Sequence, residues 1–250
     1  MDGITNSNYG GGSGGVSLSD PIIHVNVLAG SIVTFSLGGV VVKTINSSEA
    51  VLNVDGSTSD YYFSTGVMGT YTITASCSPF TAQRTVSVSS VAVYETSITY
   101  ELYLYNYGTY NSGYVADNLV SQATITDESD HIYINGTTKS IQDGYKRWAS
   151  VDLTNVKSIV SERAAYSSGT TNTDRYCAVF VTQDSSVVNA RSATIVTNVN
   201  TSTAYNTKTN ILLDVSDLTG LWYVVVGMNT NGASWTNSRK ENIYSVKLTA

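Results

Sequence analysis

Long apolar runs, basic clusters and prolines are scarce in this sequence of 250 residues, which contains two prolines. The candidate apolar runs Val40–Val42 and Val224–Val226 fall far short of the roughly 20 residues that a membrane-spanning helix needs, so we expect no membrane insertion. Charged residues make up 13% of the chain, and the net charge is −6. Nucleic acids and anionic membranes bind through clustered Lys and Arg, so this balance argues against both partners.

An export signal is missing as well. A secretory signal needs a basic start, an apolar run of about 7 to 15 residues and a small-residue cleavage site. Residues 1–9 and the glycine-rich stretch after them have none of these parts. The first interpretation is a protein that reaches the outside as part of a virus particle, made in the host cytoplasm. The alternative is an extracellular or cell-surface protein whose leader has been removed.

Cysteine is also rare, with Cys77 and Cys177 lying far apart in the sequence. Small secreted domains are more often stapled by disulfides between nearby cysteines. We therefore expect two buried thiols rather than a disulfide, as in a protein that folds in a reducing cytoplasm.

The composition divides the chain into an arm and two β domains. Residues 1–19 are rich in Gly, Ser and Asn and lack periodicity, which is typical of a flexible tether that attaches a subunit to a scaffold. From residue 20 to residue 93, short alternating runs separated by turn residues predict an antiparallel β-sandwich. The expected strands are Ile23–Val27, Val33–Phe35, Val40–Lys43, Ala50–Val54, Tyr61–Phe63, Tyr71–Ala75 and Thr85–Val93.

Three segments of this first domain resemble a known family. Ala29–Phe35, the Gly-x-Tyr-x-aliphatic segment Gly69–Ala75 and the closing Thr85–Val88 are similar to bacterial immunoglobulin-like (Ig-like) modules found on surface proteins and phage particles. The resemblance implies an Ig-like sandwich over residues 20–93. The Cys and Trp core of the antibody-type branch is absent, which excludes that branch.

Residues 94–250 are predicted as a second antiparallel sandwich, so the fold class is all-β with two β-sandwich domains. Two similar corners, Val151–Thr154 and Leu213–Ser216, leave a strand through Asp and Ser or Thr, whose side chains bond local backbone amides. We interpret them as the two points where a jelly roll crosses between sheets. The expected strands are Ile132–Ile134, Val151–Leu153, Tyr176–Val181, Ala193–Val196, Asn210–Val215, Leu221–Gly227 and Ile243–Leu248.

An aromatic segment joins the two domains. In a regular strand over residues 100–107, the side chains of Tyr103, Tyr105 and Tyr107 share one face and Leu102 and Leu104 the other. A tyrosine face packs through its rings while its hydroxyls still form hydrogen bonds. It suits packing between domains, an interface in a homo-oligomer or a ligand platform, and all three remain open.

Together, the Tyr100–Tyr107 run, the two corners and the closing aromatic and aliphatic strand resemble lectin-like, carbohydrate-binding-like modules. Such modules stand at the ends of phage tail and other virion proteins. The resemblance implies a jelly-roll, lectin-like domain on a virion surface.

Residues for catalysis are few. The two histidines, His24 and His131, fall in different predicted domains, and no Gly-x-Ser-x-Gly elbow is present to expose a nucleophile. Paired carboxylates for glycoside hydrolysis cannot be identified by spacing alone. We therefore expect no enzyme activity.

One acidic cluster is a candidate metal site. Asp127, Glu128 and Asp130 offer hard oxygen ligands of the kind that bind Ca²⁺, and carbohydrate-binding jelly rolls often hold a structural calcium. A solvated turn is nevertheless the preferred interpretation, because the Asp-x-Asp-x-Asp-Gly pattern is missing. A structural calcium is the one cofactor that this sequence suggests.

The candidate glycan contacts are aromatic and polar residues in two segments predicted as loops. A sugar stacks its C–H face on an aromatic ring while amides and charged groups bond its hydroxyls, and such weak sites gain from multivalency. The candidates are Tyr145, Arg147, Trp148, Trp235, Asn237 and Arg239. For Trp148 a position in the core is an equal alternative.

The leading hypothesis is a non-enzymatic structural protein of a phage tail or baseplate fibre. Its arm would attach to other virion proteins, and its C-terminal domain would contact host surface carbohydrate. A capsid decoration protein or head fibre, anchored by the N-terminal region, is the alternative within this class. A bacterial surface adhesin fragment is the alternative of another class, with a glycan-processing enzyme in third place.

Overall fold

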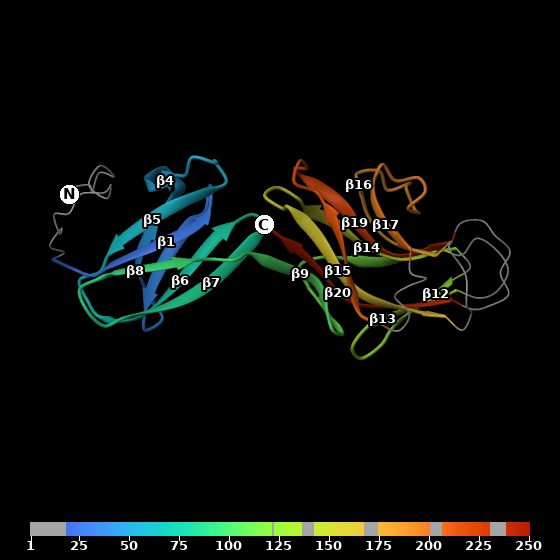
Figure 1. Ribbon diagram of the computed structural model, residues 1–250, viewed down its shortest axis with the longest axis horizontal. Helices are drawn as coiled ribbons and strands as arrows, with labels where there is room; N and C mark the ends of the chain where they lie inside the picture. The colour runs from blue at the N-terminus through green and yellow to red at the C-terminus, as the bar shows by residue number, and fades with distance from the viewer. Residues whose placement is uncertain (1–18, 122, 137–142, 168–174, 201–206, 231–238) are drawn as a thin grey trace. The chain divides into compact units, whose positions relative to one another are not determined.

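The computed structural model describes residues 19–121, 123–136, 143–167, 175–200, 207–230 and 239–250. The chain forms two compact units (Figure 1). Unit 1 comprises residues 1–74 and 83–98, and unit 2 comprises residues 75–82 and 99–250. The predicted arm, residues 1–19, lies outside the described residues as far as residue 18. The described secondary structure is almost entirely β, which confirms the predicted all-β fold of β-sandwich type.

Two four-stranded sheets lie within residues 19–98, in the orders β4-β5-β1-β8 and β3-β2-β6-β7. Strand β1 alternates as predicted, since Ile23, Val25 and Val27 are all buried. Phe63 packs against both Phe35 and Tyr71, with ring centroids 4.8 and 6.0 Å apart. The elements are β1 (Ile22–Leu28), β2 (Ile32–Leu37), β3 (Val40–Ile45), the 3₁₀ turn η2 (Ser47–Glu49), β4 (Val51–Leu52), β5 (Thr58–Ser64), β6 (Gly69–Cys77), β7 (Phe80–Val88) and β8 (Val93–Ser97).

The last strand of this part of the chain differs from the expectation. The segment expected as one strand, Thr85–Val93, is divided between the end of β7 and the start of β8. Strand β8 then pairs with β1 in parallel, which places Glu95 beside His24. The ring of His24 stacks on Tyr62 and lies between Glu95 and Asp60, whose Oδ1 is 3.1 Å from Nε2. The Ig-like assignment of this sandwich remains a prediction.

Unit 2 contains two sheets that face each other, as Figure 1 shows for β14 and β19 over β15 and β20. One sheet has the order β11-β14-β19-β16-β17. The other has the order β10-β9-β20-β13-β12, with β15 and β18 added beside β20. The strands are β9 (Glu101–Asn106), β10 (Thr109–Tyr110), β11 (Ala116–Ser121), β12 (Ala123–Asp127), β13 (Ile132–Gly136), β14 (Asp143–Asp152), β15 (Ser158–Ser167), β16 (Arg175–Thr182), β17 (Ile195–Asn200), β18 (Thr209–Asp214), β19 (Leu221–Thr230) and β20 (Arg239–Thr249).

The two predicted corners do carry the chain from one sheet to the other. Asp152 ends β14 and accepts a hydrogen bond from the Thr154 amide, and Asp214 ends β18 and accepts one from the Ser216 amide, both at 2.9 Å. The chain passes from β14 to β15 at the first corner and from β18 to β19 at the second, each time changing sheets. The corners also bond each other, because the Gly220 amide donates to the hydroxyl of Thr154.

The shared tyrosine face predicted for the aromatic segment is wrong. A β-bulge interrupts the pairing of β9 with β20, so that Tyr105 lies opposite Val246 and Tyr103 lies opposite Lys247. Leu104 is the extra residue between them, and both Leu104 and Tyr105 are buried. A bulge adds one residue to one strand and so reverses the alternation beyond it. Tyr107 lies outside the strand and is 44% exposed.

Strand β20 organises its sheet because three strands pair with it. β15 pairs along the whole of β20 on one edge. On the other edge, β9 pairs with the half from Ser245 to Thr249, and β13 pairs with the half from Arg239 to Ile243. Strands β9 and β13 therefore follow each other along one edge, and their hairpin partners β10 and β12 become neighbours.

Both cysteines behave as the sequence predicts. Cys77 and Cys177 are buried, and neither takes part in a disulfide. Within the described ranges, no helix has the length and apolar character to cross a membrane.

A buried ion pair lies in the interior of unit 2. Arg163 on β15 and Glu241 on β20 bond each other at 1% and 0% side-chain exposure. Burial lowers the pKa of Arg163 and raises the pKa of Glu241, and the attraction between the two groups opposes both shifts. Within the described structure, Nε of Arg163 and Oε2 of Glu241 have no hydrogen-bond partner.

We predict that Arg163→Met destabilises the protein by about 3–5 kcal/mol, because removing one member leaves an unpaired buried charge. The measurement is the free energy of unfolding of unit 2 in urea. Lys247→Met is the matched control, since the Lys247–Glu101 pair is partly exposed and such pairs contribute about 0–1 kcal/mol. Equal losses for the two variants would contradict the prediction.

Candidate functional site

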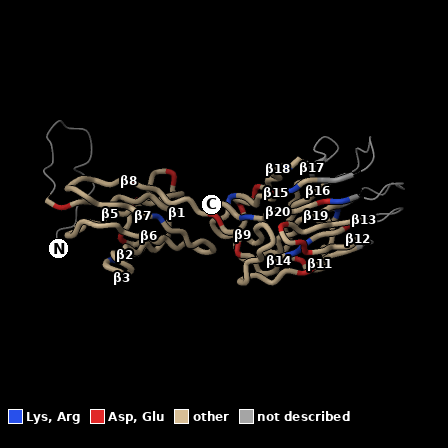
Figure 2. Tube along the Cα trace, turned by 90° about the horizontal axis from the view of Figure 1, so that it is seen from below, with Lys and Arg blue, Asp and Glu red and all other residues tan. Residues whose placement is uncertain are grey.

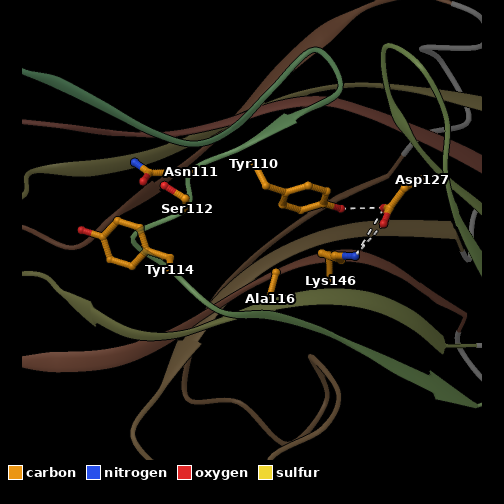
Figure 3. A pocket seen from close by; sticks show the side chains of 7 residues that line it. All are labelled: Tyr110, Asn111, Ser112, Tyr114, Ala116, Asp127 and Lys146. Atoms are coloured by element: carbon orange, nitrogen blue, oxygen red, sulfur yellow. Dashed lines mark hydrogen bonds and ion pairs between the residues drawn. The ribbon is translucent and has the colours of Figure 1, made fainter.

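One pocket of about 280 Å³ opens on unit 2. Figure 3 shows Tyr110 and Lys146 pointing toward Asp127 at one end, with Tyr114 and two small polar side chains at the other. The lining residues are Tyr110, Asn111, Ser112, Tyr114, Ala116, Asp127 and Lys146.

Both sheets and one connecting segment contribute to the pocket. Tyr110 comes from β10 and Asp127 from the end of β12, which are neighbours because β9 and β13 share one edge of β20. Lys146 comes from β14 in the facing sheet, and Ala116 begins the adjacent strand β11. The segment between β10 and β11 closes the other end. The pocket therefore lies where the margins of the two sheets meet.

Asp127 is the polar centre of the pocket. Its Oδ1 accepts a hydrogen bond from the Tyr110 hydroxyl at 2.6 Å, and both of its oxygens lie 3.2–3.3 Å from Nζ of Lys146. The side chain of Lys146 is only 7% exposed, whereas that of Asp127 is 51% exposed. An ionised carboxylate has about four acceptor positions. Asp127 thus neutralises a buried lysine and still presents acceptor positions to solvent.

The tyrosines of the pocket are held in their neutral form. Burial raises the pKa of Tyr110, and the hydrogen bond to Asp127 and the charge of that carboxylate raise it further. Burial, with a smaller contribution from Asp152, also raises the pKa of Tyr114. Nζ of Lys146 lies 4.7 Å from the centre of the Tyr110 ring, which is the geometry of a cation–π contact. Near neutral pH the pocket therefore presents two uncharged phenols and one ion pair.

Asn111 shapes the segment that closes the pocket. Its Nδ2 donates to the carbonyl oxygen of Tyr103 at 3.0 Å, and its Oδ1 accepts from the Gly113 amide at 3.0 Å. These bonds leave the neighbouring Ser112 exposed. Asn111 thus fixes the backbone, while Ser112 offers its hydroxyl to solvent.

Three of the predicted glycan contacts belong to the interior of strand β14. Tyr145 and Trp148 are both 0% exposed, so neither ring is available for stacking, which corrects the prediction for these two residues. The guanidinium of Arg147 is held by Asp117 and by the carbonyl oxygen of Ser185. β14 pairs with β11 on one side and β19 on the other, so a segment predicted as a loop is a central strand.

Packing of a loop explains why Tyr145 is covered. Its ring lies in an apolar cluster with Ala178, Phe180, Ala190 and Val225. Its hydroxyl accepts a hydrogen bond from the Ala190 amide at 3.2 Å. The segment between β16 and β17 therefore covers this face of the sheet.

The other predicted contacts lie in the last part of the chain. Trp235 and Asn237 lie outside the described residues. Arg239 begins β20, and its side chain is outside the described part. Their role in glycan binding remains a prediction.

The acidic cluster does not form a metal site in the described part of the chain, where no group of three or more His, Cys, Asp or Glu side chains is placed to hold a metal ion. Asp127 is directed to Tyr110 and Lys146, and Asp130 bonds Nδ1 of His131 at 2.6 Å. Glu128 is exposed. The three carboxylates predicted to share one calcium therefore do not converge.

Several described cations of unit 2 have an acidic partner. Arg147 pairs with Asp117, Arg191 with Asp143, and Lys247 with Glu101. Figure 2 accordingly shows blue and red positions interspersed along the described strands of this unit. These charges of unit 2 therefore lie in pairs of opposite sign.

Sequence reasoning missed most of the pocket. Tyr110 and Tyr114 flank the turn residues of the segment Asn111–Gly113, and that spacing of aromatics around a polar turn was the available signal. Lys146 lies inside a segment that was singled out for its rings. Asp127 was singled out as a metal ligand. The pairing that brings these residues together joins strands that are distant in sequence.

The fold and the pocket define the class of this protein, which is an all-β protein whose jelly-roll-like unit carries an aromatic and charged pocket. No protein-family model matches the sequence, and no curated protein matches it. A point variant of a family 29 carbohydrate-binding module, complexed with cellulohexaose, is 12% identical with a TM-score of 0.39, covering 60% of this chain and 91% of that chain. Another variant, complexed with mannohexaose, is 11% identical with a TM-score of 0.37, covering 60% and 92%. Similarity at this level does not assign the chain to a family.

We predict that Asp127→Asn lowers the pKa of Tyr110 but leaves it above the ordinary value, because burial, the largest cause of its rise, remains. NMR titration of tyrosines labelled at Cζ measures this pKa, with Tyr110→Phe assigning the signal. Tyr94 is the internal control, since hydrogen bonds from Ser90 and Ser89 lower its pKa to about 8. An unchanged Tyr110 pKa would show that Asp127 does not act on this phenol.

Proposed function

We propose that unit 2 is a non-catalytic glycan-binding module and that the pocket around Asp127 contacts the sugar. The observation that carries the proposal is that one open pocket combines the rings of Tyr110 and Tyr114 with the half-exposed carboxylate of Asp127. A sugar presents an apolar C–H face and a rim of hydroxyl groups. It therefore needs an aromatic ring and fixed polar groups side by side, and the pocket supplies both.

The polar groups suit hydroxyl ligands in particular. Asp127 accepts hydrogen bonds, and the hydroxyl of Ser112 both donates and accepts. Lys146 and the Tyr110 hydroxyl hold the carboxylate in place, so little conformational freedom is lost when a ligand binds. An open pocket with few fixed groups is expected to bind weakly and to gain from several copies.

Binding rather than hydrolysis is favoured by the carboxylate content of the pocket. Glycoside hydrolysis generally uses two carboxyl groups on either side of the bond that is broken. Asp127 is the one carboxylate among the described lining residues, and it is paired with Lys146. The pocket therefore has the groups for holding a sugar without the pair that cleaves it.

We predict that Tyr110→Ala weakens glycan binding about two- to tenfold, since an aromatic contact is worth about 0.5–1.5 kcal/mol. Asp127→Asn should weaken it about tenfold or more, since a hydrogen bond to a charged group is worth about 1.5–3 kcal/mol. An array of neutral, acidic and amino oligosaccharides, including cellulohexaose and mannohexaose, identifies the sugars bound. Isothermal titration calorimetry then gives each dissociation constant.

Asp117→Asn is the matched control for Asp127→Asn. Asp117 is also about half exposed and paired with a cation of β14, but it lies outside the pocket. Its substitution should leave binding unchanged. Equal losses at both positions would point to general electrostatics, and an array without any bound sugar would reject the proposed function.

We also propose that the protein is displayed on a phage particle, on a tail or baseplate fibre, with several copies giving the avidity that a weak pocket needs. The resemblance of the sequence to virion surface modules supports this proposal. A capsid decoration protein and a cell-surface adhesin fragment remain the alternatives.

We predict that gold-labelled antibodies against unit 2 decorate the tail tip of particles in negative-stain images. Label on the head would favour the decoration protein. Label confined to the bacterial envelope would contradict display on a particle and favour the adhesin. Particles from a phage lacking the gene are the control for antibody specificity.

A further inference from the structure

The turn between β9 and β10 places a tyrosine where small residues are usually found. Tyr107 and Gly108 both have positive φ, 41° and 84°, which is the conformation of a two-residue type I′ hairpin turn. Asn, Asp and Gly are preferred in such turns, and the left-handed conformation costs other residues about 1–2 kcal/mol. The Tyr107 side chain remains 44% exposed, so the residue is held at this turn by contacts at the surface and not in the core.

Two charged groups hold the Tyr107 side chain in place. Its hydroxyl donates a hydrogen bond to Glu162 on β15 and accepts one of 3.1 Å from Nζ of Lys208. The same Nζ lies 4.6 Å from the centre of the Tyr107 ring and 3.8 Å from that of Tyr244. A ring at the tip of a turn is thus fixed although it is largely exposed.

Tyr107 begins a row of rings that we call the aromatic row, formed by Tyr107, Tyr244 and His131. The ring centroids of Tyr107 and Tyr244 are 5.9 Å apart, and those of Tyr244 and His131 are 5.6 Å apart. The three residues come from the β9–β10 turn, strand β20 and the β12–β13 turn. Tyr244 is 7% exposed, so it supports the rings on either side of it and does not itself offer a face to a ligand.

The aromatic row adjoins the pocket. The two turns are in contact, because a side chain at Gly108 would collide with the carbonyl oxygen of Ser129. The hairpin that bears Tyr107 also bears Tyr110 of the pocket, three residues later, so their Cα atoms are at most about 11 Å apart. The segment that carries His131 also carries Asp127. The β9–β10 hairpin and the β12–β13 segment therefore each supply one residue of the aromatic row and one residue at the polar end of the pocket.

We propose that the aromatic row is a second subsite that binds further units of a sugar chain whose first unit lies in the pocket. The ligand class is then an extended oligosaccharide or polysaccharide chain rather than a single terminal sugar. This inference rests on the proposed function of the pocket. Tyr107 supplies the stacking ring, and Lys208 and Glu162 supply the donor and the acceptor for hydroxyl groups.

The test compares chain lengths in the full protein. Each glycan of the array is printed as fragments of two, four and six units, the cellulose and mannan series among them. We predict that native protein binds six units more tightly than two. Tyr107→Asn should weaken binding of six units about two- to tenfold, as expected for the loss of one aromatic contact, and leave two units unaffected.

A variant that suits the turn, a second variant with its control and an NMR signal keep this test independent of folding. Asn suits a type I′ turn, so Tyr107→Asn is expected to fold. Lys208→Met removes the cation of the row, and Lys247→Met is its control, because Lys247 likewise lies near a tyrosine ring and pairs with a glutamate. The chain has two histidines, so their ring signals in NMR are easily assigned. The signal of His131 should shift when six units bind but not when two units bind, and the signal of His24 should stay unchanged.

The outcomes separate the two proposals. Equal affinity for two and six units, or an unchanged length dependence in folded Tyr107→Asn and Lys208→Met, would overturn the second subsite and leave the pocket intact. Binding of no glycan of any length would reject the proposed function, and the second subsite with it.

Discussion

The architecture of unit 2 depends on how the two edges of strand β20 are used. β15 occupies one edge along its whole length, so β9 and β13 must follow each other along the other edge. Their hairpins then meet at Gly108 and Ser129, where only glycine leaves enough room. Tyr110 and Asp127 are 17 residues apart in sequence and become hydrogen-bonded neighbours for this reason. The pairing of strands with β20 therefore brings together the side chains that form the pocket.

Two ion pairs of this unit differ in how far their members are buried. Arg163 and Glu241 are both buried, so neither charge can turn to a ligand without leaving the other unpaired. Lys146 is buried as well, but its partner Asp127 is half exposed. Lys146 holds the carboxylate on its buried side, and the exposed side of the carboxylate faces the pocket. One ion pair is thus enclosed in the core, whereas the other leaves carboxylate oxygens accessible at the pocket.

Most strands within residues 19–98 and the sheet crossings of unit 2 could be predicted from the sequence, because they depend on local signals. Alternation identified β1, and the Asp-containing corners at Asp152 and Asp214 form the expected bonds to backbone amides. The faces of the aromatic residues could not be predicted. One extra residue, Leu104, reverses the alternation of β9, and partner strands on both sides bury the rings of β14. These effects depend on pairing between distant strands, which no local pattern records.

A shallow site of this kind can reach a useful affinity in two physically different ways. Several copies on one particle raise the effective concentration of pockets near a surface, and this gain depends on how densely the protein is displayed. A longer contact along one glycan chain adds binding energy within a single protein and depends on chain length instead. The exposed position of Tyr107 favours the second route. A tyrosine in a left-handed turn is costly for folding, and the contacts with Glu162, Lys208 and Tyr244 that offset this cost also fix a partly exposed ring near the pocket.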